Sequence, residues 1–194
     1  MSRTASSQPE TDSKTIFGFW VYLMTDVILF AALFATFAVL RGNTYGGPSG
    51  RELFSLPFVL VESLLLLTSS FTCGLALLAV HRRDKNMVML WFGITFVLGL
   101  SFLIMELSEF RNLVLEGNSW RRSGFLSAFF TLVGTHGLHI TVGLIWIIVL
   151  LIQVLRRGLV QANVRAFTLL GLFWHFLDII WIFIFSIVYL MGAV

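Results

Sequence analysis

The sequence predicts an all-α integral membrane protein, a bundle of five transmembrane helices, and two observations carry that prediction. First, 58% of the 194 residues are hydrophobic and only 12% are charged, and the mean hydropathy is +0.92, which is too apolar for a soluble domain of this size. Second, the apolar residues form five continuous blocks, each long enough for the ~20 residues that cross a bilayer core.

The predicted spans follow from these blocks and cover about residues 16–40, 57–80, 87–110, 123–155 and 166–193. The blocks are continuous rather than alternating, which favours helices over the strands of a β-barrel. Short polar turns separate them, so residues 15–194 are expected to form a single membrane domain. Residues 1–14, "MSRTASSQPETDSK", are polar and are predicted to be a disordered cytoplasmic tail.

The distribution of basic residues predicts the orientation, because cytoplasmic loops carry the excess of Lys and Arg. Eight of these residues lie on the side of the N-terminus and five on the opposite side. The count places the N-terminus in the cytoplasm and the C-terminus in the periplasm. The net charge of +3 follows from this topology and gives no indication of nucleic-acid binding.

Ionisable residues inside the predicted spans form two layers. The layer near the middle of the membrane contains Asp26, His136, His139, His175 and Asp178. The layer nearer the outer face contains Glu62, Glu106 and Glu109. Residues three apart share a helix face, so the two glutamates of the third span, the histidines of the fourth span and the His–Asp pair of the fifth each point one way.

These residues are interpreted as polar contacts between helices, because ionisable groups in membranes nearly always face the bundle interior and pair there. A metal site at His136 and His139 is not expected, since two imidazoles need further ligands and a supporting shell. A proton relay remains an alternative role for His175 with Asp178. Glu109 is near the interface and is expected to meet one of the basic residues Arg111, Arg121 and Arg122.

Small and aromatic residues give two further expectations. The segment "GTHGLHITVG" places Gly134, Gly137 and Gly143 along the fourth predicted helix, where other helices can approach closely. A compact bundle is therefore expected. Four aromatic residues are expected at the membrane interfaces, namely Trp20, Trp91, Trp120 and Tyr189.

Two motifs in the last two predicted spans suggest a family. "SGFLSAFFTLVGTHGLHITVGLIWI" and "FWHFLDIIWIFIFSIVYL" closely resemble the third subunit of the haem-copper respiratory oxidases. "FVLVESLLLLTSS" and "ELSEF" are similar to family segments that carry glutamates at the positions of Glu62 and Glu109. The first span is similar to the family helix with a buried, carbodiimide-reactive carboxylate, whose position Asp26 occupies where mitochondrial-type members have a glutamate. Five spans and "KTIFGFWVYLMTD" look most like the bacterial cytochrome o ubiquinol oxidases.

The resemblance implies a non-catalytic accessory subunit of a proton-pumping terminal oxidase in the bacterial cytoplasmic (inner) membrane. Such a complex oxidises ubiquinol and reduces oxygen to water, so the chain would belong to the electron-transport machinery of aerobic respiration. No catalytic residue, metal or cofactor is expected in this chain. Haem and copper are expected in the catalytic subunit I, and bound phospholipid is expected between the helices.

The resemblance also gives the candidate site residues their expected roles. Buried contacts to other helices, to lipid or to subunits are expected for Asp26, Glu62, Glu109, His136, His139, His175 and Asp178. Asp26 is the first candidate for contact with lipid or with the catalytic subunit, and the fifth-span pair is expected to lock its helix through the face of the two fourth-span histidines.

Two alternatives remain open from the sequence. One is a small proton-coupled transporter that uses Asp26, Glu62 and the histidines as its relay. The other is a haem-binding membrane anchor with His136 and His175 as axial ligands.

Overall fold

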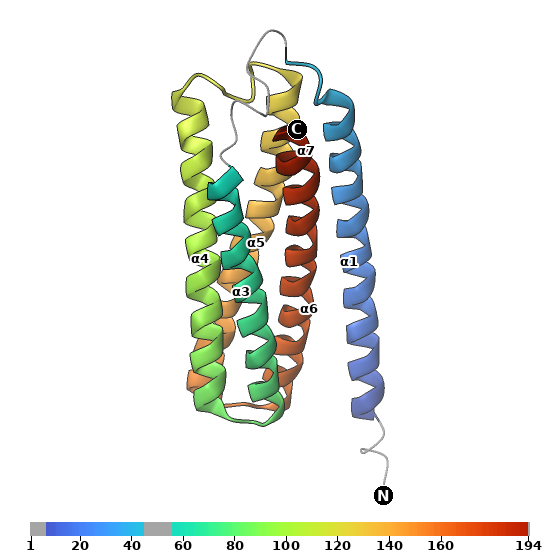
Figure 1. The fold of residues 1–194 in the computed structure, drawn as a ribbon. Coiled ribbons are helices and arrows are strands. Elements are labelled where there is room, and N and C mark those ends of the chain that lie inside the picture. The colour runs from blue at the N-terminus through green and yellow to red at the C-terminus, as the bar shows by residue number, and fades with distance from the viewer. Residues whose placement is uncertain (1–6, 45–55, 194) are drawn as a thin grey trace, which may run out of the picture.

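The structure, a computed structural model, describes residues 7–44 and 56–193, and within these residues it is helical with no strand (Figure 1). The helices are α1 (Ser7–Leu40), α3 (Leu56–His81), α4 (Lys85–Leu115), α5 (Gly124–Arg157) and α6 (Gln161–Ile184). A π-helical turn, η1 (Phe185–Leu190), and the short α7 (Met191–Ala193) continue α6.

Five helical segments in the described residues are long and apolar enough to cross a membrane, which confirms the predicted fold class. They are Lys14–Leu40, Leu56–His81, Lys85–Leu115, Gly124–Arg157 and Gln161–Leu190. The chain is therefore a multi-pass membrane protein.

Polar residues at the turns define where the helices begin and end. The Asp84 carboxylate accepts hydrogen bonds from the backbone N–H groups of Asn86 and Met87 and so caps α4. The Ser123 hydroxyl accepts from the N–H of Leu126 and caps α5. Gly158 ends α5 at a φ of 72°, a conformation that costs glycine little.

The first helix begins earlier than its span. Residues 7–14, which composition predicted to be a disordered tail, continue α1 in the structure. Extending an existing helix is far less costly than nucleating one, because each added residue gains a hydrogen bond. Residues 1–6 of the predicted tail lie outside the described residues.

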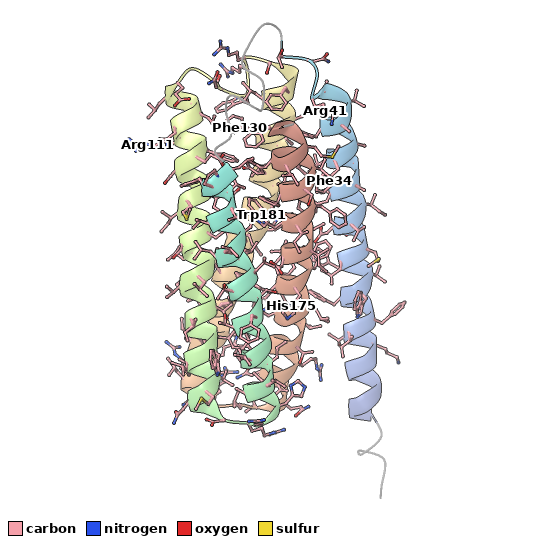
Figure 2. The ribbon with its side chains drawn as sticks, in the orientation of Figure 1. Phe34, Arg41, Arg111, Phe130, His175 and Trp181 are labelled. Carbon is pink, nitrogen blue, oxygen red and sulfur yellow. The ribbon has the colours of Figure 1, made fainter. Side chains whose placement is uncertain are left out.

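Four helices form the body of the bundle, and α1 stands beside it (Figure 1). Helix α3 packs against α4 and α6, and α5 packs against the same two helices, whereas α1 packs mainly against α5 and α6. The α3–α4 and α5–α6 turns lie at the end of the bundle near the N-terminus, and Arg41 and Arg111 lie toward the other end (Figures 1 and 2). Which end faces the cytoplasm stays a prediction.

The core is filled by large aromatic side chains that enter gaps left by glycines. Trp174 of α6 is 1% exposed and lies between Gly99 of α4 and Gly143 of α5. A Cβ atom at either glycine would lie 2.8 Å from the indole ring, closer than real Cβ contacts. The absent side chain at Gly143 therefore makes space for a tryptophan, and close approach of the helix backbones there stays a prediction.

Candidate functional site

Helix α6 is tied to α3 by three side-chain contacts. His175 Nδ1 lies 2.7 Å from the Ser70 hydroxyl. The indole N–H groups of the two tryptophans on this face of α6 also reach α3 serines: Trp174 Nε1 donates to Ser69 Oγ at 3.2 Å, and Trp181 Nε1 donates to Ser63 Oγ at 3.0 Å. In Figure 2, His175 lies nearer than Trp181 to the end with the α3–α4 turn.

The structure thus gives His175 a different partner from the one predicted. The expected lock through His136 and His139 is not formed, because His175 meets Ser70 of α3. Asp178, one turn further along α6, is buried, and its Oδ1 has no hydrogen-bond partner among the described residues. No hydrogen bond or ion pair joins His175 to Asp178 in the part of the chain that the structure describes.

The α3 serines were missed by sequence reasoning, which ranked ionisable residues above hydroxyls. A signal was present, because Ser63 and Ser70 are seven residues apart and so lie on one helix face. Ser69 continues the contact into α4 by donating to the Thr95 carbonyl at 3.1 Å, and Thr95 Oγ1 lies 2.9 Å from Thr72 Oγ1. Hydroxyl contacts therefore connect α6, α3 and α4.

A second group, here the carboxyl cluster, contains Glu62 of α3, Glu106 and Glu109 of α4, and Tyr189 of η1. The Tyr189 hydroxyl donates to Glu109 Oε2 at 2.9 Å. Glu62 is completely buried, and neither of its carboxyl oxygens has a hydrogen-bond partner among the described residues. Glu106 is 1% exposed and lies against Gly137, where a Cβ atom would be 2.6 Å from its Oε1.

Two expectations for this cluster are corrected by the structure. Glu109 meets a tyrosine hydroxyl where the sequence suggested an arginine. Tyr189, which was expected at the membrane interface, is completely buried in the bundle, where its hydroxyl donates to Glu109 of α4. Trp20 and Trp120, by contrast, are 46% and 52% exposed, and their place at the membrane interface stays a prediction.

The two histidines of α5 face different surroundings. The His136 ring is completely buried, stacks on Trp181 with centroids 5.3 Å apart and meets Phe102 edge-on at 6.0 Å. Both His136 nitrogens lack a hydrogen-bond partner among the described residues. A haem could reach this ring only by displacing the two aromatic side chains.

His139 connects α5 to α1. Its Nδ1 lies 2.7 Å from the Thr135 carbonyl, so this nitrogen donates, and its Nε2 lies 3.8 Å from Asp26 Oδ1. Phe30 of α1 packs against the His139 ring at 5.3 Å. The side chains of His139 and Asp26 remain 15% and 10% exposed. The polar contact of α1 is thus partly open at the edge of the bundle.

The half-buried Tyr189–Glu109 contact predicts a measurable effect. Replacing Tyr189 with phenylalanine removes the donor and leaves the half-buried Glu109 acceptor without it, which is expected to cost about 1 kcal/mol of stability. Thermal unfolding in detergent would measure the loss. In a double-mutant cycle with Glu109→Gln the two effects should be non-additive, and strictly additive effects would contradict a direct contact.

Fold and site together define the class of protein: a five-span helical membrane protein whose helices are joined by hydroxyl and indole groups and which buries several ionisable side chains. Among the described residues, no group of three or more His, Cys, Asp or Glu side chains is arranged to hold a metal ion. The family model "Cytochrome c oxidase subunit III" matches residues 8–193, and the chain belongs to this family.

Curated relatives match over almost the whole length. The chain is 54% identical over 184 residues to the cytochrome bo(3) ubiquinol oxidase subunit 3 of Pseudomonas aeruginosa, covering 95% of this chain and 88% of the relative. It is 48% identical to the subunit of the same name from Buchnera aphidicola, covering 94% of both chains. It is 49% identical to the cytochrome c oxidase subunit 3 of Bacillus sp. strain PS3, covering 91% and 86%. These findings confirm the family resemblance and do not support the transporter alternative.

Proposed function

We propose that this chain is the third subunit of a bacterial haem-copper ubiquinol oxidase and acts there as an accessory subunit without a catalytic centre of its own. The complex would oxidise ubiquinol, reduce oxygen to water and pump protons across the cytoplasmic membrane. Haem and copper would lie in the catalytic subunit I. The present chain would support the assembly and stability of that subunit and bind phospholipid.

The observation that carries this proposal is the family match from residue 8 to residue 193. Relatives named for ubiquinol oxidases, at 54% and 48% identity, support ubiquinol as the electron donor. Burial supports the accessory role, because Glu62, Glu106 and His136 are at most 1% exposed and are closed off from the surface.

The structure also supports different roles for different candidate residues. His175 would fix α6 against α3, and Glu109 would fix η1 against α4, so these residues would act in packing. Asp26 and His139 keep part of their surface open beside α1 and are the residues proposed to meet lipid or the catalytic subunit.

The proposal is tested by purifying the chain under mild detergent through an affinity tag at its N-terminus. Co-purifying chains, the absorption spectrum and quinol-dependent oxygen uptake would be measured together. A stoichiometric, larger haem-containing partner and quinol oxidase activity are the expected results. A colourless single chain, obtained under conditions that keep related oxidases intact, would overturn the proposal.

Replacing Asp178 with leucine is expected to weaken assembly, because it removes a buried carboxyl next to the α3–α6 contact. The haem spectrum of each surviving complex should stay unchanged, since the haem would belong to another subunit. The amount of assembled complex per membrane protein is the measurement, and Asp178→Asn, which keeps size and polarity, is the matched control. Full assembly of the leucine variant would show that the carboxyl is not needed for packing.

A further inference from the structure

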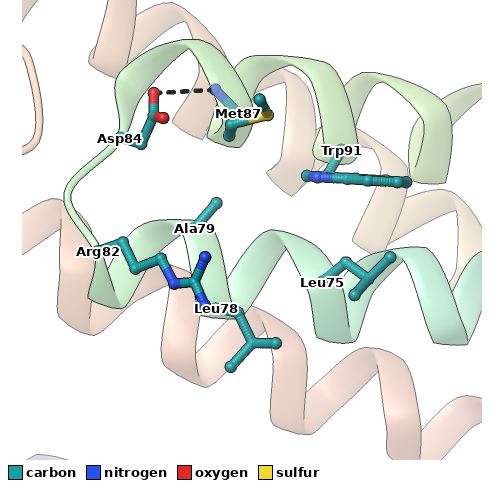
Figure 3. A pocket seen from close by; sticks show the side chains of 7 residues that line it. All are labelled: Leu75, Leu78, Ala79, Arg82, Asp84, Met87 and Trp91. Carbon is teal, nitrogen blue, oxygen red and sulfur yellow. Dashed lines mark hydrogen bonds between the residues drawn. The ribbon is translucent and has the colours of Figure 1, made fainter.

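A groove lies at the turn between α3 and α4, at the end of the bundle where the basic turns gather (Figure 3). It encloses about 330 Å³. Its walls are apolar and are formed by Leu75 and Leu78 of α3 and by Trp91 of α4, and Arg82 lies at its rim. The groove is therefore apolar in its depth and cationic at its mouth.

The Arg82 guanidinium has no hydrogen bond or ion pair among the described residues. The guanidinium of its neighbour Arg83, by contrast, donates to Gln161 Oε1 at 2.9 Å. Asp84 also lines the groove, but its Oδ1 accepts from backbone N–H groups at the start of α4 (Figure 3). The Asp84 carboxylate thus stabilises the helix terminus and does not pair with Arg82.

The groove lies where the apolar span of α3 ends. Arg82 directly follows the end of the α3 span, and Leu75 lies seven residues earlier, which is about 10 Å deeper along a helix. Trp91 forms the opposite wall, and its indole N–H has no partner among the described residues. Tryptophans in this position mark the headgroup level of a bilayer.

We propose that this groove binds one anionic phospholipid. The phosphate lies on the Arg82 guanidinium, which suits phosphate oxygens in a bidentate arrangement, and an acyl chain follows Leu75, Leu78 and Trp91. Anionic lipids are the natural ligands here, because the basic turns are predicted to face the cytoplasmic leaflet, where such lipids provide the negative surface potential.

A second groove in the same chain shows why the arginine decides the ligand. It lies on the outer face of α4, is lined by residues such as Leu90, Ile94 and Val97, and encloses about 500 Å³. No charged residue lines it, so it can hold an acyl chain but cannot select a headgroup. The smaller groove combines both requirements.

The inference rests on the phospholipid binding of the proposed function and adds to it a lipid class and the residues that recognise that class. The two tests are distinguishable, because this inference is tested by the lipid preference of one groove, whereas the proposed function is tested by the identity and activity of the partners.

The test is a lipid titration of the purified complex in a neutral detergent, followed by native mass spectrometry. Phosphatidylglycerol and phosphatidylcholine with identical acyl chains are compared on the native complex and on complexes with Arg82→Gln or Lys85→Gln. Lys85 is the matched control, because it carries the same charge on the same turn but does not line the groove. A cavity with Arg156 and Arg157 lies at the α5–α6 turn, so the difference between variants, not the total lipid count, assigns the site.

The Arg82→Gln complex is expected to bind phosphatidylglycerol about tenfold more weakly, which is the loss of one charge-assisted hydrogen-bonding partner. It should lose the preference over phosphatidylcholine at this site. The Lys85→Gln complex should stay within about twofold of the native complex, because an exposed charge outside the groove contributes little. Equal weakening by both variants would reduce the effect to diffuse attraction and overturn the inference. An unchanged Arg82→Gln complex, or a native complex without preference for the anionic lipid, would also overturn it.

Discussion

Replacing Trp181 with alanine is expected to cost about 3–5 kcal/mol of stability, the range for removing a large buried aromatic side chain. Trp181 is completely buried in the centre of the bundle. Its ring meets Phe102 at 4.6 Å in a T-shaped contact and stacks on His136, and its indole N–H donates to Ser63. Four helices therefore meet on one side chain, since these residues lie on α3, α4, α5 and α6. Thermal or denaturant unfolding in detergent would measure the effect.

A phenylalanine at position 181 separates the two parts of that effect. It keeps a ring against Phe102 and His136 but loses the hydrogen bond to Ser63, so a smaller cost of about 0.5–1.5 kcal/mol is expected from that bond. If alanine and phenylalanine destabilise equally, ring packing is not what holds the four helices together.

Replacing Gly143 with alanine is expected to cost about 1–3 kcal/mol through overpacking, although alanine is the better helix former. The added Cβ would lie 2.8 Å from Trp174 Cζ3. The indole has no room to move away, because a Cβ at Gly99 of α4 would also lie 2.8 Å from its ring and because its N–H donates to Ser69. The double variant Gly99→Ala with Gly143→Ala should lose more than the sum of the single variants. Unfolding in detergent and the yield of assembled complex are the measurements.

Gly134 provides the control on the same helix. A Cβ atom there would lie 3.6 Å from Phe110, an ordinary contact, so Gly134→Ala is expected to be neutral or slightly stabilising. Equal losses at Gly134 and Gly143 would mean that the cost arises from α5 itself and not from the tryptophan.

The helix boundaries show how far the sequence predicted the spans and where the structure differs. The span that begins at Leu56 was predicted to begin at 57, and the span that ends at Leu40 was predicted to end there. The last span differs more: it begins at Gln161, five residues before the predicted 166. Asn163 is accommodated there by a local hydrogen bond, since its Nδ2 donates to the carbonyl of Gly158 across the α5–α6 turn, and the residue is buried.

At the site, too, the sequence predicted one part and the structure supplied the other. The sequence identified the ionisable residues, because a charged or polar side chain in an apolar run is visible without a structure. It did not identify their partners. His175 meets a serine 105 residues away, and Glu109 meets a tyrosine 80 residues away. Such pairs depend on how two helices are rotated and shifted relative to one another.

The sequence by itself determined the number of spans, the all-helical class and the family. Transfer of apolar side chains out of water acts on each block of about 20 residues separately, so composition along the chain is sufficient to define a span. Only the tertiary structure decided which helices touch, where Trp174 and Trp181 lie, and which hydroxyls meet the buried polar groups. In a membrane the lipid is as apolar as the helix surface, so close packing and hydrogen bonds between helices select the arrangement, and both depend on three-dimensional fit.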